Sequence, residues 1–594
     1  MNQPLRIAEG QMLYSDIRHI YGPFSPYLNA LLFKIFSPSL NVLYTSGIIT
    51  ALIIIFLSYW LSRQIMSRIA ALASTLAIMW LCGFKQAGNY FLPYSYGALH
   101  ACALGLISLF FLVNAVKTTA PTKESEKHQS ILTRRFFSNH LVWLFLAGVF
   151  AGFTLLAKTE MGIAAVATGI IAGGILNYPN LNKSLKSIAC FFFPALLIIS
   201  GVYGFFIAQV GWQVVSNENF IFFQHVPPEL VYFNRRMSGL DKPLDSIISI
   251  IGSLLRLAFL AVAIVIVSQL ITYKKDKQSA SANIPLADAG QVQIIYLWGL
   301  LFLSITVIFT LSFTGIMQWD NGPYLAMPIL LIGSMVIIIK GYLKEISARG
   351  FAHQHTLIVI LFSGYALISL SRVILRVRSG GAYSSYLLPV SVILFTYILA
   401  YQLPGLIKNP KTRIIARNIT IALILSDAIL TSFLLAYRYR QKNTYPIITE
   451  RGTIVAVNDL GIAFDKAIEY INRESDENDY VAVMPEGTSL NFFTRRANPL
   501  REEITTPGFL DAEGEERTIK RLAETQTKLI LIANRATSEF GPIRFGRDYN
   551  QRLMQWIKDH YEESEVLGPV DNQDLQIGDP IFFLKAYRRK TSSM

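Results

Sequence analysis

The first segment that could carry out chemistry is GQMLYSDIRHIYGP, residues 10–23, near the start of the chain. It places Asp16, Arg18 and His19 shortly before a Gly-Pro turn. A carboxylate next to basic side chains can take a proton from a hydroxyl group while a neighbouring cation binds a phosphate. We therefore interpret Asp16 as a candidate general base, and Arg18 or His19 as a candidate phosphate contact. The competing interpretation is a solvated loop with an internal ion pair.

Basic side chains also stand near the ends of three apolar stretches. These candidates are Lys85 in CGFKQAGNYFLPY, Lys158 with Glu160 in LAKTEMG, and Arg376 with Arg378 and Tyr383 in SRVILRVRSGGAYSSYLLP. Cations held at a membrane boundary can neutralise the phosphate of a lipid-linked substrate. The same residues are also typical of snorkelling anchors, of a Lys-Glu pair that compensates itself and of an interfacial Arg-Tyr belt. Both interpretations stay open from the residues alone.

A third type of candidate is the loop GIMQWDNGP, residues 315–323, which holds Asp320 beside Trp319 and Asn321. An aromatic face with polar groups at its rim is a combination that suits a sugar. The loop is equally typical of a turn with an interfacial tryptophan.

The elements that position these side chains are mostly membrane helices. The chain has 594 residues, of which 52% are hydrophobic and only 15% charged, whereas soluble domains have about 25% charged residues. The net charge is +14, but residues 438–594 hold 22 Lys+Arg and 25 Asp+Glu, so the basic excess belongs to the apolar part. Basic residues dispersed between apolar spans are typical of membrane topology, and no basic stretch is interleaved with a stacking platform for nucleic acid. The three cysteines lie in apolar runs, which excludes a disulfide scaffold.

A helix that crosses a bilayer needs about 20 apolar residues. We count twelve such stretches, roughly 39–61, 66–84, 94–116, 140–158, 159–178, 186–209, 247–271, 291–313, 323–340, 354–376, 385–403 and 413–437. The fourth and fifth are separated only by a Lys-Thr-Glu triplet, so one long bent helix is the alternative there. Lys and Arg concentrate in alternate loops, which places those loops in the cytoplasm and both the N-terminal segment and the C-terminal domain outside.

The tail after the last apolar stretch alternates helix and strand signals. Helices are predicted over 459–474 and 548–560, and strands over 480–484, 528–533 and 580–587. We therefore expect a polytopic α-helical membrane protein with a C-terminal α/β domain. The expected organisation is a first outer loop with an interfacial helix (1–38), a transmembrane bundle (39–437) and an extracytoplasmic domain (438–594). The tail has no GxGxxG, P-loop or GxSxG motif.

Three segments together resemble a known enzyme family. They are AEGQMLYSDIRHIYGPFSPYLNALLFKIF (8–36), GVFAGFTLLAKTEMG (148–162) and YSSYLLPVSV (383–392). They are similar to bacterial polytopic glycosyltransferases of the GT-C fold, of the family 39 type, with protein mannosyltransferase and aminoarabinose transferase relatives. The resemblance covers the membrane part and implies a bundle of about twelve spans in the bacterial inner membrane.

The resemblance also implies an activity. Such enzymes take a sugar from a polyprenyl phosphate at the outer face of the membrane and transfer it to a lipid, glycan or protein acceptor with inversion. An Asp of the first outer loop deprotonates the acceptor hydroxyl and basic side chains hold the leaving phosphate, so no cofactor or nucleotide is expected, while a carboxylate-bound divalent ion is left open. On this chain the base would be Asp16. The substrate and phosphate contacts would be Arg18, His19, Lys85, Lys158, Glu160, Asp320, Arg376, Arg378 and Tyr383.

One departure from the family affects the base. In family members an acidic motif, often Asp-Glu, follows a first membrane helix, ten or more residues before the segment that matches Gly10–Pro23. The present sequence begins after that point. We therefore expect either that Asp16 does this work or that the true base is encoded upstream of Met1.

Two other classes remain as alternatives. A flippase or secondary transporter for lipid-linked sugars also suits twelve spans, although we find no internal repeat. A glycan ligase or polymerase with a lipid-diphosphate donor would share the basic outer loops.

Overall fold

The computed structural model describes residues 1–84, 88–119, 139–219, 226–279, 299, 303–304, 306–307, 322–377, 384–570, 575 and 581–590. Helices are the main element. They are α1 (Asn2–Ala8), α2 (Phe24–Phe36), α3 (Leu40–Ser62), α4 (Arg68–Ile78), η1 (Met79–Gly83), α5 (Tyr96–Thr119), α7 (His140–Ala157), α8 (Thr159–Leu176), α9 (Leu181–Val210), α10 (Trp212–Asn219), α11 (Pro228–Ser238), α12 (Pro243–Ser279), η4 (Pro323–Ala326), α14 (Met327–Arg349), α15 (Gln354–Leu370), η5 (Ser371–Val373), α16 (Ser384–Leu387), α17 (Pro389–Tyr397), η6 (Ile398–Gln402), α18 (Leu403–Gly405) and α19 (Pro410–Lys442).

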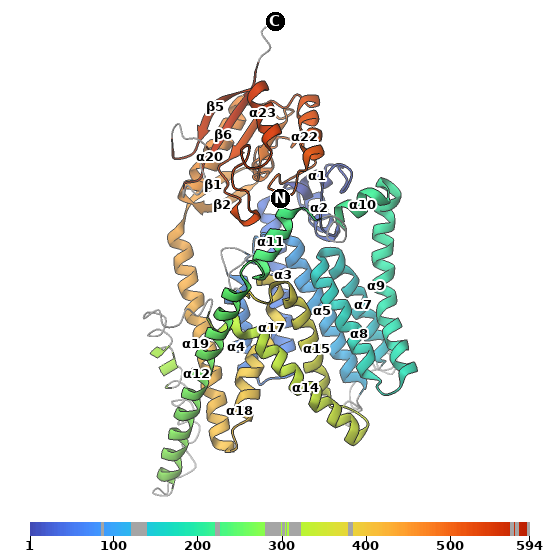
Figure 1. Cartoon of the computed structure of the whole chain (residues 1–594), viewed down its shortest axis with the longest axis vertical. Helices are drawn as coiled ribbons and strands as arrows, with labels where there is room; N and C mark the ends of the chain where they lie inside the picture. The colour runs from blue at the N-terminus through green and yellow to red at the C-terminus, as the bar shows by residue number, and fades with distance from the viewer. Residues whose placement is uncertain are drawn as a thin grey trace. The chain divides into compact units, whose positions relative to one another are not determined.

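The chain forms two compact units. Unit 1 comprises residues 1–46, 202–237 and 437–594, and unit 2 comprises residues 47–201 and 238–436. Unit 2 is helical, with α5, α7, α8 and α15 packed side by side (Figure 1).

Nine helices within the described ranges are long and apolar enough to cross a membrane, so the chain is a multi-pass membrane protein. Two of the twelve predicted spans are shorter apolar helices instead, Arg68–Gly83 and Pro389–Gly405. Both contain a π-helical turn, η1 and η6 respectively. The predicted span over 291–313 lies largely outside the described residues.

The predicted spans 140–158 and 159–178 are two separate helices rather than one long bent helix, because the helical backbone is interrupted at Lys158. This residue is extended, with φ −156° and ψ 118°, and it separates α7 from α8. The two helices then pack against each other directly. A Cβ atom at Gly162 would lie 2.3 Å from Leu155 Cα, so the close approach of α8 to α7 requires glycine at this position.

Unit 1 contains the C-terminal α/β domain. Its elements are β1 (Asn443–Thr449), β2 (Gly452–Val457), α20 (Asn458–Glu474), β3 (Val481–Met484), α21 (Ser489–Thr494), α22 (Ala512–Glu524), β4 (Leu529–Ala533), η7 (Ser538–Phe540), α23 (Gln551–His560), β5 (Tyr561–Leu567) and β6 (Leu584–Arg589). The antiparallel pair β1–β2 stands apart from a four-stranded sheet of order β3-β4-β6-β5, in which β3 and β4 are parallel and the other neighbours antiparallel.

Alternate residues of the sheet form two hydrophobic cores, one on each face. Ile530 and Ile532 of β4 pack with Leu553 and Ile557 of α23 on one face. Leu529 and Leu531 belong to the core on the other face, with residues of α20 and α21. Because both faces are buried, the strands read as continuous apolar runs, which is why β3 and β4 are visible in the sequence.

The sequence predicted the fold class correctly. The predicted helices and strands of the tail correspond to α20, β3, β4, α23 and β6 within a few residues. Helix α22 and strands β1, β2 and β5 were not predicted. Helix α22 and strand β5 are rich in charged residues, and only part of each faces the core. The amphipathic stretch after Pro26 is helical as α2.

Candidate functional site

The predicted site residues fall into both units. Asp16, Arg18 and His19 belong to unit 1, whereas Lys158, Glu160 and Arg376 belong to unit 2. Each group is described within its own unit. Four further candidates, Lys85, Asp320, Arg378 and Tyr383, lie outside the described residues.

The break between α7 and α8 holds a buried cation. Lys158 is 2% exposed and its Nζ lies 3.9 Å from Glu160 Oε1. The same carboxylate oxygen lies 3.1 Å from Nη1 of Arg372, which comes from η5. Glu160 is in the first turn of α8, where a negative charge is favoured by the helix dipole. A carboxylate therefore lies between two cations at the end of two membrane helices.

A second ion pair involves the arginine four residues further along the chain, after η5 has ended. Arg376 Nη1 is 3.8 Å from Asp241 Oδ1, just before α12 begins. Gly239 has φ +82°, and a Cβ atom there would lie 3.1 Å from Arg376 Cβ. Glycine therefore allows the turn before α12 to approach Arg376 closely.

Unit 2 therefore holds two sets of ion-paired side chains: Lys158 and Arg372 with Glu160, and Arg376 with Asp241. The two sets carry three positive and two negative charges. A buried ammonium is costly unless it is compensated, and Glu160 supplies a negative charge to both Lys158 and Arg372. The arrangement is suited to binding an anionic group.

Two segments that adjoin the candidates Lys85 and Tyr383 in the sequence contact each other in unit 2. Tyr90 Oη donates to the Ser385 carbonyl at 2.8 Å, and Tyr386 Oη donates to the Asn89 carbonyl at 3.3 Å. The two tyrosine rings stack with centroids 5.8 Å apart. Two candidate motifs that are distant in the sequence, NYFLPY and YSSYLLP, are therefore joined by reciprocal hydrogen bonds.

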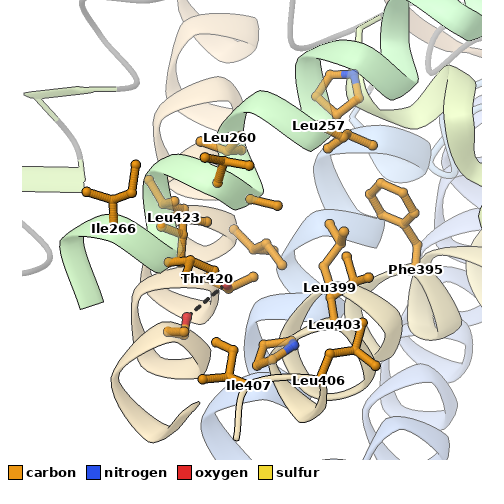
Figure 2. Close-up of a pocket in the computed structure, with 18 of the residues that line it drawn as sticks. Leu257, Leu260, Ile266, Phe395, Leu399, Leu403, Leu406, Ile407, Thr420 and Leu423 are labelled. Atoms are coloured by element: carbon orange, nitrogen blue, oxygen red, sulfur yellow. Dashed lines mark hydrogen bonds between the residues drawn. The ribbon is translucent and has the colours of Figure 1, made fainter. Parts of the chain in front are cut away.

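Unit 2 also contains an apolar cavity of about 400 Å³. Figure 2 shows that leucine and isoleucine side chains of α12, α18 and α19 surround it, with Phe395 of α17. Its polar lining includes Thr420, which donates to the Ala416 carbonyl, and Asp427, which accepts from Thr431. A mostly apolar lining of this kind suits a hydrocarbon chain.

In unit 1, Asp16 belongs to a tight loop and is exposed. Its Oδ2 accepts from the Met12 amide at 2.8 Å, and its own amide donates to the Met12 carbonyl. Tyr14 has φ 69°, and its amide donates to the Ile17 carbonyl. The carboxylate therefore closes this loop, and its role as a base stays a prediction.

The neighbouring candidates are bound to protein groups. Arg18 donates to the Phe509 carbonyl through its side chain, and the His19 amide donates to Glu218 Oε2 at 3.2 Å. Glu218 Oε1 in turn accepts from Arg501 at 2.7 Å. Burial raises the pKa of Glu218, while the positive charge of Arg501 opposes this rise. The contact with Phe509 gives the Arg18 side chain a structural role, and its role in phosphate binding stays a prediction.

Sequence reasoning did not select several residues of these clusters. Arg501 donates to the carbonyls of Tyr14 and Ser15 as well as to Glu218, and so holds the Asp16 loop in place. It stands in the tail, far from the loop in the chain, and no local pattern identifies it. Arg372 belongs to the recognised SRVILRVRSGG segment, but only the fold pairs it with Glu160.

No protein-family model and no curated protein matches this sequence. Among solved structures, the chain is similar to the archaeal oligosaccharyltransferase AglB from Archaeoglobus fulgidus in complex with an inhibitory peptide and a dolichol-phosphate. The TM-score is 0.43 and the identity 12%, over 100% of this chain and 70% of that chain. It is also similar to ArnT from Cupriavidus metallidurans bound to undecaprenyl phosphate, with a TM-score of 0.36 and 14% identity, over 98% of this chain and 92% of that chain. Likenesses at this level carry no conclusion about activity.

Proposed function

We propose that this chain is a membrane glycosyltransferase that takes a sugar from a polyprenyl-phosphate donor. The acceptor is a lipid, glycan or protein at the outer face of the membrane. The observation that carries the proposal is the buried Lys158, which shares Glu160 with Arg372 at the end of two membrane helices. The sequence motifs of the first outer loop and of the LAKTEMG segment support it.

The chemistry needs stabilisation of a leaving phosphate. When the bond between the sugar's anomeric carbon and the phosphate oxygen breaks, its electron pair stays on the phosphate and negative charge develops there. Cations fixed beforehand, such as Lys158 and Arg372, lower this barrier because they need no reorganisation. The acceptor hydroxyl attacks the anomeric carbon from the opposite side, which inverts it, and a carboxylate takes the proton. Asp16 is the candidate for that carboxylate.

The donor's hydrocarbon chain needs an apolar site in the same unit. The cavity lined by α12 and α19 supports this part of the proposal. Helix α12 begins at Pro243, and the first of its residues that lines the cavity is Leu257. At 1.5 Å per residue, the two positions are about 21 Å apart along the helix. A lipid with its phosphate near Arg376, the partner of Asp241, and a long extended chain can span such a distance.

The test is sugar transfer in membranes that contain the full chain. The donors are undecaprenyl-phosphate sugars with a radiolabel, and the readout is label in lipid, glycan and protein fractions. We expect Lys158→Met and Arg372→Met to lower the rate by roughly 10²–10³-fold each. The control is Arg473→Met, which removes an exposed, ion-paired arginine of unit 1. Equal rates in all four proteins would contradict the proposal.

The same assay separates the alternative classes. An undecaprenyl-diphosphate glycan replaces the monophosphate donor in one arm, and transfer from it alone would identify a ligase or polymerase. Movement of labelled lipid across sealed vesicles with no new glycosidic bond would identify a flippase.

A further inference from the structure

The C-terminal domain has one sheet edge where two parallel strands end side by side. Strands β3 and β4 are parallel neighbours that end at Met484 and Ala533. After β3 the chain enters α21, whose Leu490 packs in the core on one face of the sheet. After β4 it leads to α23, whose Leu553 packs on the other face. Helix α22, in the same connection between β3 and β4, packs its Leu522 in the second of these cores. Ligands of open α/β sheets bind outside the carboxyl ends of the strands.

Charged side chains gather at this edge. Arg535, two residues after β4, has its Nε 3.3 Å from Oε2 of Glu486, two residues after β3. The same guanidinium group also pairs with Glu539 of η7. All three side chains are partly exposed, between 23% and 37%, so a ligand can reach them.

Buried hydroxyl groups lie next to these charges. Thr505 donates its amide to the Pro485 carbonyl, directly before Glu486, and accepts from Asn550. The hydroxyl oxygens of Thr505 and Thr506 are buried and make no hydrogen bond in the structure. A buried polar group without a partner is costly, so each is a place where a water molecule or a ligand is expected. Tyr549 is close to Arg535, and burial raises the pKa of this tyrosine to about 12, so its hydroxyl keeps its proton at neutral pH.

An exposed aromatic ring completes the surroundings. Tyr232 of α11 is 43% exposed, and its Cδ1 would lie 3.8 Å from a Cβ atom at Gly541. Next to it, Phe233 stacks on Phe540 with ring centroids 4.8 Å apart. An accessible aromatic face therefore lies beside the residue that follows η7.

The chemistry of these groups selects the ligand. Glu486 and Glu539 repel an anion, and Arg535 already balances one of them. No group of three metal-binding side chains occurs here or elsewhere in the described part of the chain. A sugar ring fits, because its hydroxyls donate to carboxylates and accept from a guanidinium while its apolar face lies on an aromatic ring.

We propose that the carboxyl ends of β3 and β4 form a binding site for a neutral sugar, with Arg535, Glu486 and Glu539 as polar contacts and Tyr232 as the stacking face. Binding at this site does not depend on the transfer reaction. If the transfer proposal also holds, the site would bind a glycan acceptor.

The test is saturation-transfer-difference NMR on the full chain in lipid nanodiscs free of glycoside detergent. The probes are glucose, galactose, mannose and N-acetylglucosamine, each at millimolar concentration. We expect signals from the ring protons of at least one sugar. Arg535→Met removes a charged hydrogen-bond donor, so it should weaken that binding by roughly tenfold. Tyr232→Ala should reduce the signal as well.

Two further variants make the outcome decisive. Arg473→Met removes an exposed, ion-paired arginine of the same domain and should leave the signals unchanged. Glu539→Gln keeps the side-chain volume and serves if Arg535→Met does not fold. No saturation transfer to any of the four sugars in the folded wild type overturns the proposal, as do equal signals from the wild type and from folded site variants. Neither result bears on sugar transfer from a lipid phosphate.

Discussion

Two loops of unit 1, at opposite ends of the chain, have the same backbone architecture. In Leu13–Ile17 the Tyr14 amide donates to the Ile17 carbonyl, and in Phe545–Tyr549 the Gly546 amide donates to the Tyr549 carbonyl. Asp16 accepts from the amide four residues before it at 2.8 Å, and Asp548 does the same at 2.9 Å. An aspartate at this position is therefore sufficient to close such a loop, whatever else it does.

The loops differ in the residue that takes the left-handed conformation. Gly546 has φ 76° and Tyr14 has φ 69°. Glycine adopts this region without strain, whereas a tyrosine there costs about 1–3 kcal/mol. Tyr14 is fully buried, its ring meets Phe206 edge-on at 5.0 Å, and its hydroxyl donates to the Tyr21 carbonyl at 2.8 Å. In the first loop, tertiary contacts hold Tyr14 in the left-handed conformation. In the second loop, Gly546 adopts the same conformation without such support.

The largest expected effect is a difference in sugar-transfer rate between variants of Asp16 and Asp548. Asp16→Asn should reduce sugar transfer by roughly 10²–10⁴-fold if Asp16 is the general base, because an amide cannot take the proton. Asp548→Asn should leave transfer unchanged while disturbing an equivalent loop. The measurement is transfer rate at equal amounts of folded protein. Equal rates in both variants would leave Asp16 with the structural role alone.

Arg501 tests what holds the first loop. Arg501→Met removes three contacts and leaves Glu218 buried without its cation, which should cost about 2 kcal/mol of stability. The folded pKa of Glu218 is raised by burial and should rise further in the variant. A raised carboxyl pKa makes a contribution to stability that is present at low pH and lost as pH rises through it. The deficit in apparent melting temperature should therefore shrink as the pH falls from 7 toward 4.5, and a constant deficit would contradict this cause.

Gly546→Ala tests the second loop. The new Cβ would lie 2.4 Å from Met554 Cγ, and the left-handed conformation costs an L-residue about 1–2 kcal/mol. Thermal unfolding should show a loss of about this size. Gly174→Ala is the matched control, because a Cβ there meets nothing within 4 Å.

Tyr14→Phe should have the smallest effect. It keeps the ring packing and removes a hydroxyl that donates to the Tyr21 carbonyl and also interacts with Asn219, at a cost of about 1 kcal/mol. A loss several times larger would mean that the hydroxyl has a second role, and the same unfolding assay measures it.

The sequence predicted most of the fold, because its signals are local. Apolar length identified the long spans, and short continuous β-rich runs such as YVAVM and KLILIA identified the buried strands. It did not predict α22, since GEERTIKRLAE is mostly charged and only a few of its residues, such as Leu522, reach the core. It also counted Arg68–Gly83 and Pro389–Gly405 as full spans, because hydropathy does not show where a helix ends.

The candidate site was predicted only in part. The Lys158-Thr159-Glu160 triplet left two interpretations open, a phosphate contact and an internal ion pair; the structure shows Lys158 3.9 Å from Glu160, and the phosphate contact stays a prediction. The contact of Arg18 with the Phe509 carbonyl was not predicted, because no local pattern connects the two residues, and the phosphate contact of Arg18 stays a prediction.

The sequence by itself determined that this is a multi-pass membrane protein with an α/β tail, because burial in a bilayer or in a sheet imposes a pattern on neighbouring residues. Only the tertiary structure decided which charges meet. Arg372 reaches Glu160, Arg376 reaches Asp241, and Arg501 reaches the Asp16 loop across long separations in the chain. The electrostatic role of an ionised group depends on the charges within a few ångströms of it, and those neighbours are set by packing rather than by sequence order.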